Sequence, residues 1–179
     1  MYKMKRSATL SLITIICAAY LADQLYPAFY EKTALFGPLV ESGQYWRLFT
    51  VALVHGGLTH LFFNMFSLLL LGNPIEAVLG KARFLVIFFT SLLTGSLASI
   101  YLTNDLHVSV GASGAIFGLF GAFIALGKRL NQGARDIYVI VGLNFVFGFI
   151  LGGVDWRAHL GGLVGGYLTT AVLLRITRV

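Results

Sequence analysis

Ser113 and His159 are the residues whose types best suit nucleophilic chemistry, and they lie in the glycine-rich stretches GASGAIFG and AHLGGLVGG. A serine hydroxyl becomes a good nucleophile only when a base takes its proton, and a neutral imidazole can do so near pH 7. His60 and Asn64 are spaced i to i+4, so both can donate hydrogen bonds to an oxyanion from one face of a helix. The four residues together predict acyl transfer by a serine–histidine pair.

No carboxylate is expected to orient the histidine. Asp155 precedes His159 by four residues and is predicted to lie in a loop, so we expect a catalytic dyad rather than a triad. A metal site is not expected either, because no cysteine or inner carboxylate completes a zinc ligand set with His55, His60 and His159.

The composition indicates what kind of protein must position these groups. Of the 179 residues, 58% are hydrophobic and 11% are charged, and the mean hydropathy is +0.84, so the chain cannot assemble a water-soluble surface. A hydrocarbon core about 30 Å thick needs roughly 20 apolar residues per helix, which allows about six crossings. We therefore expect an all-α membrane protein, a six-transmembrane-helix bundle that forms a single domain over residues 1–179.

Continuous apolar runs support helices, because a β-barrel would show alternating segments of about ten residues. The predicted spans are residues 8–25, 58–79, 82–103, 113–127, 135–151 and 158–176. The fourth run would reach only about 22 Å as a helix, less than the thickness of the hydrocarbon core. The loop before it is therefore expected to dip inward and to place Ser113 at the floor of a water-filled pocket.

The distribution of Lys and Arg predicts that both termini are cytoplasmic. With the N-terminus inside, ten of the thirteen basic residues are cytoplasmic, and Lys32, Arg47 and Arg157 are outside. Cations along the inner leaflet account for most of the formal charge of +6, so no nucleic-acid partner is implied. We expect a multi-pass protein of the cytoplasmic membrane, with His107 as a solvated residue of a short outer loop.

This topology brings the polar residues to one depth in the membrane. The second, fourth and sixth predicted spans all enter from outside, and their first turns carry His60 with Asn64, Ser113, and His159 respectively. Polar groups within spans are costly and usually face the bundle interior. One shared site that opens to the extracytoplasmic side is therefore predicted.

The same stretches also have a packing explanation. Small residues four positions apart commonly mark close helix contacts in membranes, and a serine in a membrane helix often bonds its own backbone. The glycine pairs of this kind are Gly114–Gly118, Gly161–Gly165 and Gly162–Gly166. Packing and catalysis are compatible, because a close approach of the fourth and sixth spans would bring Ser113 near His159.

The stretches YWRLFTVALVHGGLTHLFFNM, GASGAIFG and AHLGGLVGG resemble, in this order, the rhomboid family of intramembrane serine proteases. The match of three motifs on the expected spans is specific, and the resemblance covers nearly the whole chain. It implies that Ser113 is the nucleophile, that His159 is the base, and that His60 and Asn64 are the oxyanion donors.

The resemblance also implies supporting roles. Trp46 and Arg47 match a pair in the large first loop of the family; by themselves they could equally be an interfacial aromatic and a snorkelling cation. Glu76 matches a polar position of the second helix that helps to anchor that loop, and His55 matches a further histidine near the end of the loop.

Three further residues surround the predicted nucleophile. Gly111 is expected to let the descending loop turn without a Cβ, and Gly114 to let the fourth helix press against a neighbour. Phe117 stands where many relatives carry a tyrosine stacked on the base. Stacking is therefore expected here, whereas a hydrogen bond from a ring hydroxyl is not possible.

Two functions remain open on the sequence. The first is an intramembrane serine endopeptidase that cleaves transmembrane-helix substrates near the outer face. The second is a non-catalytic relative that binds transmembrane clients; a small-solute transporter is less favoured, because paired repeats with broken helices are not seen. Inactive relatives usually lack the serine or the histidine, and the presence of both favours the enzyme. Expected partners are transmembrane substrates and the lipid bilayer, no cofactor is expected, and the sequence indicates no oligomeric state.

Overall fold

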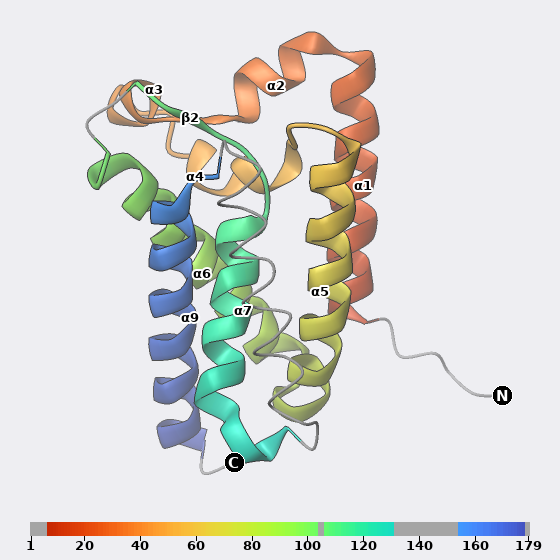
Figure 1. Cartoon of the computed structure of the whole chain (residues 1–179), viewed down its shortest axis with the longest axis vertical. Coiled ribbons are helices and arrows are strands. Elements are labelled where there is room, and N and C mark those ends of the chain that lie inside the picture. The colour runs from red at the N-terminus through yellow and green to blue at the C-terminus, as the bar shows by residue number, and fades with distance from the viewer. Residues whose placement is uncertain (1–6, 104–105, 131–153, 178–179) are drawn as a thin grey trace, which may run out of the picture.

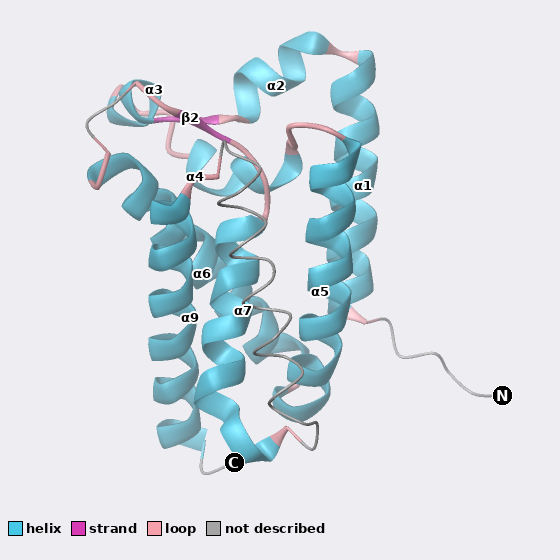
Figure 2. Cartoon of the chain, viewed as in Figure 1, coloured by secondary structure: helices cyan, strands magenta, loops and turns pink. Residues whose placement is uncertain are grey.

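The computed structural model describes residues 7–103, 106–130 and 154–177, which form a mostly helical bundle (Figures 1 and 2). Within these ranges, four helices are long and apolar enough to cross a membrane: α1 (Ala8–Leu25), α5 (Leu58–Leu79), α6 (Lys81–Tyr101) and α9 (Trp156–Thr177). The shorter apolar helix α7 (Ser113–Leu126) lies among them and is followed by a 3-10 turn, η2 (Gly127–Arg129). Helices are thus found where five of the six spans were predicted, and the predicted span over 135–151 lies outside the described residues.

The segment between α1 and α5 folds into short elements at one end of the bundle, the upper end in Figure 1. These elements are α2 (Pro27–Thr33), β1 (Leu35–Phe36), α3 (Gly37–Glu41), α4 (Arg47–Thr50) and η1 (Val51–Leu53). Strand β1 pairs antiparallel with β2 (Val108–Ser109), so that Leu35 lies opposite Ser109. The mostly helical fold agrees with the expected all-α class, and this short ladder ties the first loop to the segment that leads into α7.

Local sequence explains several helix boundaries. The Ser7 hydroxyl accepts a hydrogen bond from the Leu10 amide at 3.3 Å and caps α1, and Pro27 opens α2, where its missing N–H costs nothing. Gly80 has a φ of +81° and separates α5 from α6. A backbone in this conformation favours glycine, so the turn between these two long helices is encoded locally.

Helix α7 is the centre of the bundle. All its residues from Gly114 to Phe123 are buried, and it packs against α5, α6 and α9. A helix that is enclosed on all sides needs no polar face, which explains why its sequence is continuously apolar or small. It has 14 residues, and at a rise of about 1.5 Å per residue it is shorter than the bilayer core, as expected.

Helix α9 packs against both α6 and α7 along two pairs of glycines. A Cβ at Gly162 would overlap the backbone carbonyl of Gly114, and one at Gly166 would overlap that of Gly118. The other pair of α9 glycines meets Thr94 of α6. The close helix contacts predicted from small residues four apart are therefore confirmed for the contact of α9 with α7.

Candidate active site

Ser113 and His159 meet at the starts of α7 and α9. The Ser113 Oγ and His159 Nε2 atoms lie 2.9 Å apart, and the His159 side chain is buried. One helical turn further along α7, the Phe117 ring stacks on the imidazole with a centroid distance of 3.9 Å and an interplanar angle of 10°. The glycine contacts bring the two helices close enough for this hydrogen bond, along which a proton can pass from the hydroxyl to the imidazole.

His60 lies beside the loop that enters α7. Its Nδ1 accepts a hydrogen bond from the Gly56 amide at 3.4 Å, so the neutral ring carries its proton on Nε2, where it is a donor. Gly111 has a φ of +109°, and a Cβ there would lie 2.8 Å from His60 Cε1. Only glycine satisfies both the backbone conformation and the contact, so the turn without a Cβ that was expected here is confirmed.

Asn64 lies one turn after His60 on α5 and is buried. Its Nδ2 donates to the His60 carbonyl at 2.9 Å, and its Oδ1 has no hydrogen-bond partner among the described residues. An amide nitrogen carries two protons, so Nδ2 can make a second hydrogen bond. The Ser113 amide lies in the first turn of α7, where amides have no intrahelical acceptor, and can provide a further donor.

His55 is buried against His60, with ring centroids 5.1 Å apart in an edge-to-face arrangement. Burial, and secondarily the neighbouring His60, lower the pKa of His55 to about 3, so its ring is neutral at ordinary pH. Neither ring nitrogen has a hydrogen-bond partner among the described residues. Among all the described residues, no three His, Cys, Asp or Glu side chains are grouped so that they could hold a metal ion.

Trp46 and Arg47 hold the first loop together. The Arg47 guanidinium is buried and donates to the carbonyls of Ala34 at 2.6 Å and Glu31 at 2.8 Å, and the Trp46 indole donates to the Lys32 carbonyl at 3.1 Å. Arg47 is therefore not a snorkelling cation, because its charge is enclosed by backbone acceptors. Both residues join α4 to the α2–β1 segment, and their contacts are with the loop rather than with Ser113.

Glu76 does not anchor the first loop, contrary to the role that the resemblance implied. Its carboxylate accepts hydrogen bonds from the Ser7 hydroxyl at 2.9 Å and from the amides of Ala8 and Thr9 at 2.8 and 2.9 Å. These groups form the start of α1, which meets the C-terminal end of α5, at the end of the bundle away from the first loop (Figure 1). Glu76 therefore caps α1, because first-turn amides attract a negative charge.

Asp155 has contacts that the sequence did not predict. It directly precedes α9, and its carboxylate accepts the hydroxyl of Ser99 and the amide of Ala158. His107 Nε2 lies 3.6 Å from the same carboxylate, so His107 is not the purely solvated residue that was expected. An aspartate just before a helix is a preferred N-cap, and this signal could have identified the Ala158 contact but not the others.

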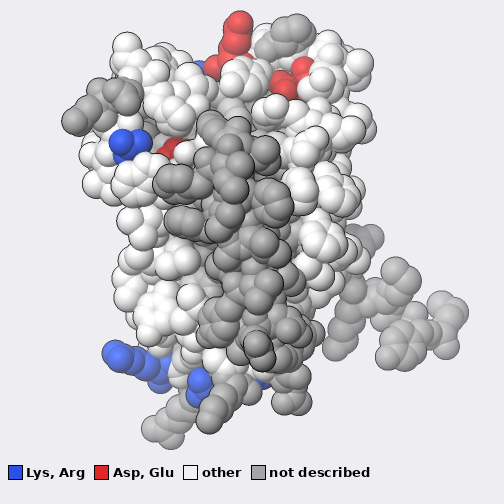
Figure 3. Space-filling view, viewed as in Figure 1, with Lys and Arg blue, Asp and Glu red and all other residues white. Residues whose placement is uncertain are grey.

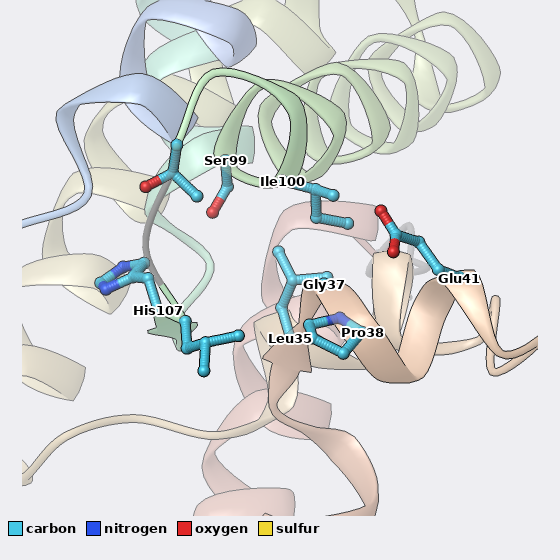
Figure 4. Close-up of a pocket in the computed structure, with 9 residues that line it drawn as sticks. Leu35, Gly37, Pro38, Glu41, Ser99, Ile100 and His107 are labelled. Atoms are coloured by element: carbon cyan, nitrogen blue, oxygen red, sulfur yellow. The ribbon is translucent and has the colours of Figure 1, made fainter.

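A cavity of about 160 Å³ opens between α3 and the C-terminal end of α6 (Figure 4). It is lined by Leu35, Gly37, Pro38, Glu41, Ser99, Ile100, Thr103, Leu106 and His107. None of these residues belongs to the predicted catalytic set, so this cavity is separate from the Ser113–His159 pair.

The fold and the site together define a mostly helical, multi-pass membrane protein with a serine–histidine pair inside the bundle. The family model described as Rhomboid domain matches residues 42–176. The chain belongs to the rhomboid family.

Individual relatives match over most of this chain but over less of their own length. Rhomboid protease GluP of Bacillus subtilis (strain 168) is 40% identical over 140 residues, which cover 75% of this chain and 27% of GluP. YdcA of the same strain is 40% identical over 135 residues, 72% of this chain and 67% of YdcA. Inactive RHOMBOID-like protein 8 of Arabidopsis thaliana is 36% identical over 143 residues, 76% of this chain and 40% of that protein. Because relatives named as protease and as inactive both match, similarity by itself does not decide activity.

Proposed function

We propose that this chain is an intramembrane serine endopeptidase that cleaves transmembrane-helix substrates near the extracytoplasmic face by a Ser113–His159 dyad. The observation that carries the proposal is the 2.9 Å distance between Ser113 Oγ and His159 Nε2, beneath the stacked ring of Phe117. Polar groups inside a helical membrane bundle are costly to keep. A serine and a histidine in hydrogen-bond contact at two helix starts are therefore best explained by chemistry.

The reaction begins with proton transfer from Ser113 to His159. His159 Nε2 takes the hydroxyl proton while Oγ attacks the carbonyl carbon of the scissile peptide. The imidazolium then gives this proton to the leaving amine, and the amine departs from the acyl-enzyme. Water, activated by the same imidazole, hydrolyses the ester and restores the free serine.

Three donors are assigned to the oxyanion of the tetrahedral intermediate: His60 Nε2–H, Asn64 Nδ2–H and the Ser113 amide. The support for His60 is its acceptor bond from the Gly56 amide, which leaves the proton on Nε2, and its contact with Gly111. The support for Asn64 is its buried amide with a second N–H available. Removing one such donor typically costs about 100- to 1000-fold in rate.

We place the chain in the cytoplasmic membrane as a single six-span domain over residues 1–179, with both termini in the cytoplasm. Among the described residues seen in Figure 3, Lys and Arg gather mainly at the end where α7 and α9 finish, and Asp and Glu at the opposite end. This asymmetry agrees with the excess of cations on the inner side of membrane proteins. The dyad, which lies at the starts of α7 and α9, would then open toward the outside.

The proposed substrates are proteins with a transmembrane helix that reaches the site from within the bilayer. A peptide bond in a helix is shielded, so the substrate must unwind locally before Ser113 can attack. Helix-destabilising residues lower the cost of this step, by roughly 1 kcal/mol for a glycine relative to an alanine. The proposed partners are therefore the lipid bilayer, which surrounds the enzyme, and a locally unstable substrate helix within that bilayer.

Covalent labelling tests the proposal directly. Detergent-solubilised protein is treated with a fluorophosphonate probe, and cleavage of a single-span model substrate is followed in parallel. Label on Ser113 is expected in the native chain and in Ser91→Ala, a matched control whose buried hydroxyl donates to the Ile87 carbonyl of its own helix. Ser113→Ala and His159→Ala are expected to lose both labelling and cleavage. A folded native chain that takes up no probe and cleaves no substrate contradicts the proposal.

A second function is a non-catalytic protein that binds transmembrane clients, and the match to a relative named as inactive supports it. The two functions differ in their dependence on the nucleophile. A client-binding protein would co-purify equally with a single-span helix in the native and Ser113→Ala forms and would release no fragment. A protease would release fragments in the native form alone.

A further inference from the structure

Four groups contact the carboxylate of Asp155. The Ser99 hydroxyl donates to Oδ2, the Ala158 amide donates to Oδ1 at 3.1 Å, and His107 Nε2 lies 3.6 Å from Oδ2. The Ser109 side chain makes a further hydrogen bond to this carboxylate. The Asp155 side chain is only 9% exposed, so these partners replace most of its water.

These partners belong to the segments that carry the two catalytic groups. Ser109 is in β2, four residues before Ser113, and Asp155 is four residues before His159. Ser99 lies near the end of α6, the helix against which both α7 and α9 pack. A single carboxylate thus links the segment leading to the nucleophile, the helix carrying the base and their common neighbour.

The backbone of Asp155 acts on His159 as well. The Asp155 carbonyl accepts a hydrogen bond from the His159 amide at 3.2 Å in the first turn of α9. A first turn is the part of a helix that frays most easily, and a side-chain cap resists this fraying. Asp155 therefore fixes both the start of α9 and the backbone position of His159, from which the imidazole extends.

We propose that Asp155 is a positioning residue for the dyad, which holds the first turn of α9 against β2 and α6 so that His159 Nε2 stays within hydrogen-bond distance of Ser113 Oγ. The inference rests on the proposed protease function. The carboxylate does not contact Ser113 or the substrate in this scheme. Its effect is on the geometry of the base.

Substitutions at Asp155 separate positioning from folding. Asp155→Ala removes all four side-chain contacts, and we expect kcat per folded molecule to fall by about 10- to 100-fold, because sub-ångström shifts of a base are costly. KM should change by less than about twofold, since substrate binding is untouched. Asp155→Asn keeps an acceptor for the Ala158 amide and polar atoms for the serines, so kcat should stay within about threefold of the native value.

A pair of serine variants on α6 provides a matched comparison. Ser99 and Ser96 are both 3% exposed, but the Ser99 hydroxyl donates to Asp155 whereas that of Ser96 donates to the Leu48 carbonyl at 2.9 Å. Ser99→Ala should lower kcat by about threefold, and Ser96→Ala should leave it within about twofold of the native value. In an Asp155→Ala background, Ser99→Ala should have no further effect, because its partner is already gone.

The measurements are kcat and KM on a single-span substrate, the rate of fluorophosphonate labelling and the thermal midpoint of each purified variant. The proposal is overturned if Asp155→Ala lowers the midpoint but keeps the native kcat per folded molecule, or if Asp155→Asn is as inactive as Asp155→Ala. If Asp155→Ala does not fold, Asp155→Asn and the serine pair decide the question. Failure of the protease function itself is recognised separately, because the native chain would then take up no probe.

Discussion

Asp155 and Glu76 are two carboxylates with nearly the same chemistry at opposite ends of the bundle. Each accepts hydrogen bonds from hydroxyl groups and from the amides of a helix start: Asp155 from its own helix α9, and Glu76 from α1 across the contact with α5. Both use the partial positive charge that an uncapped helix start presents.

The two carboxylates differ in what they join. Asp155 links segments that lead directly to Ser113 and His159, whereas Glu76 links α1 to the far end of α5, away from the dyad. The same kind of carboxylate cap can therefore support the geometry of a reacting pair or the stability of the fold. The difference lies in the elements that it connects, and variants at the two ends should separate the two effects.

Gly111→Ala is expected to have the largest effect, at the dyad end. The new Cβ would lie 2.8 Å from His60 Cε1 on a backbone with a φ of +109°. In the proposed mechanism, displacing His60 removes an oxyanion donor, so kcat should fall by about 100- to 1000-fold. The measurement is kcat on a single-span substrate, normalised to folded protein.

Gly43→Ala is the matched control for this prediction. Gly43 has a φ of +103°, and a Cβ there meets no atom within 4 Å, so the backbone strain is similar but no contact with the site is made. Its kcat should stay within about threefold of the native value. Equal losses in both variants would show that strain, rather than the displacement of His60, lowers the rate.

Glu76→Ala should act on stability alone. It leaves the Thr9 hydroxyl and the amides of Ala8 and Thr9 without their acceptor, and Thr9 is fully buried. The free energy of unfolding should fall by about 2 to 4 kcal/mol, with kcat per folded molecule unchanged. Unfolding in mixed detergent micelles measures the first quantity and substrate cleavage the second.

Glu31→Ala removes an exposed carboxylate and should leave both quantities unchanged. A loss of kcat in Glu76→Ala at native stability would contradict the comparison, because the α1 cap would then be coupled to the dyad.

Phe117 variants should give a smaller change at the dyad end than Gly111→Ala. Phe117→Leu removes the stacked ring from His159 and should lower kcat by about 2- to 10-fold, the range expected from an aromatic pair. Phe117→Tyr keeps the stack and should remain near the native rate. Phe123→Leu, a buried aromatic of the same helix, should lower stability without lowering kcat. If Phe117→Leu retains the native kcat, the stack has no part in positioning the base.

Much of the helical framework could be predicted because apolar runs of helical length carry their own signal. The bounds of α1 and α5 agree with the predicted spans, and α7 begins at Ser113 as predicted. The short strands β1 and β2 could not be found in this way, since two residues show no period and their pairing joins positions about 70 residues apart.

The site was predictable where spacing within one element decides the geometry. His60 and Asn64 share a face of α5 because they are one turn apart. The stacking of Phe117 on His159 was implied by the resemblance to the family, and the two rings are indeed in contact. The partners of Asp155 and Glu76 were not predictable. Ser99 is 56 residues from Asp155, and Ser7 is 69 residues from Glu76, so only the packing of the helices decides that they meet.

The sequence by itself determined a membrane protein of apolar helices with a serine, two histidines and an asparagine at helix starts, because hydropathy and helical period are local properties. Only the tertiary structure decided that α9 approaches α7 closely enough for Ser113 and His159 to form a 2.9 Å contact. It also decided which carboxylate supports that contact and which one caps α1 at the far end. The physical reason is that a buried carboxylate must accept hydrogen bonds to offset its lost hydration. The packing of the helices decides which donors lie within reach, and some of these donors are distant in sequence.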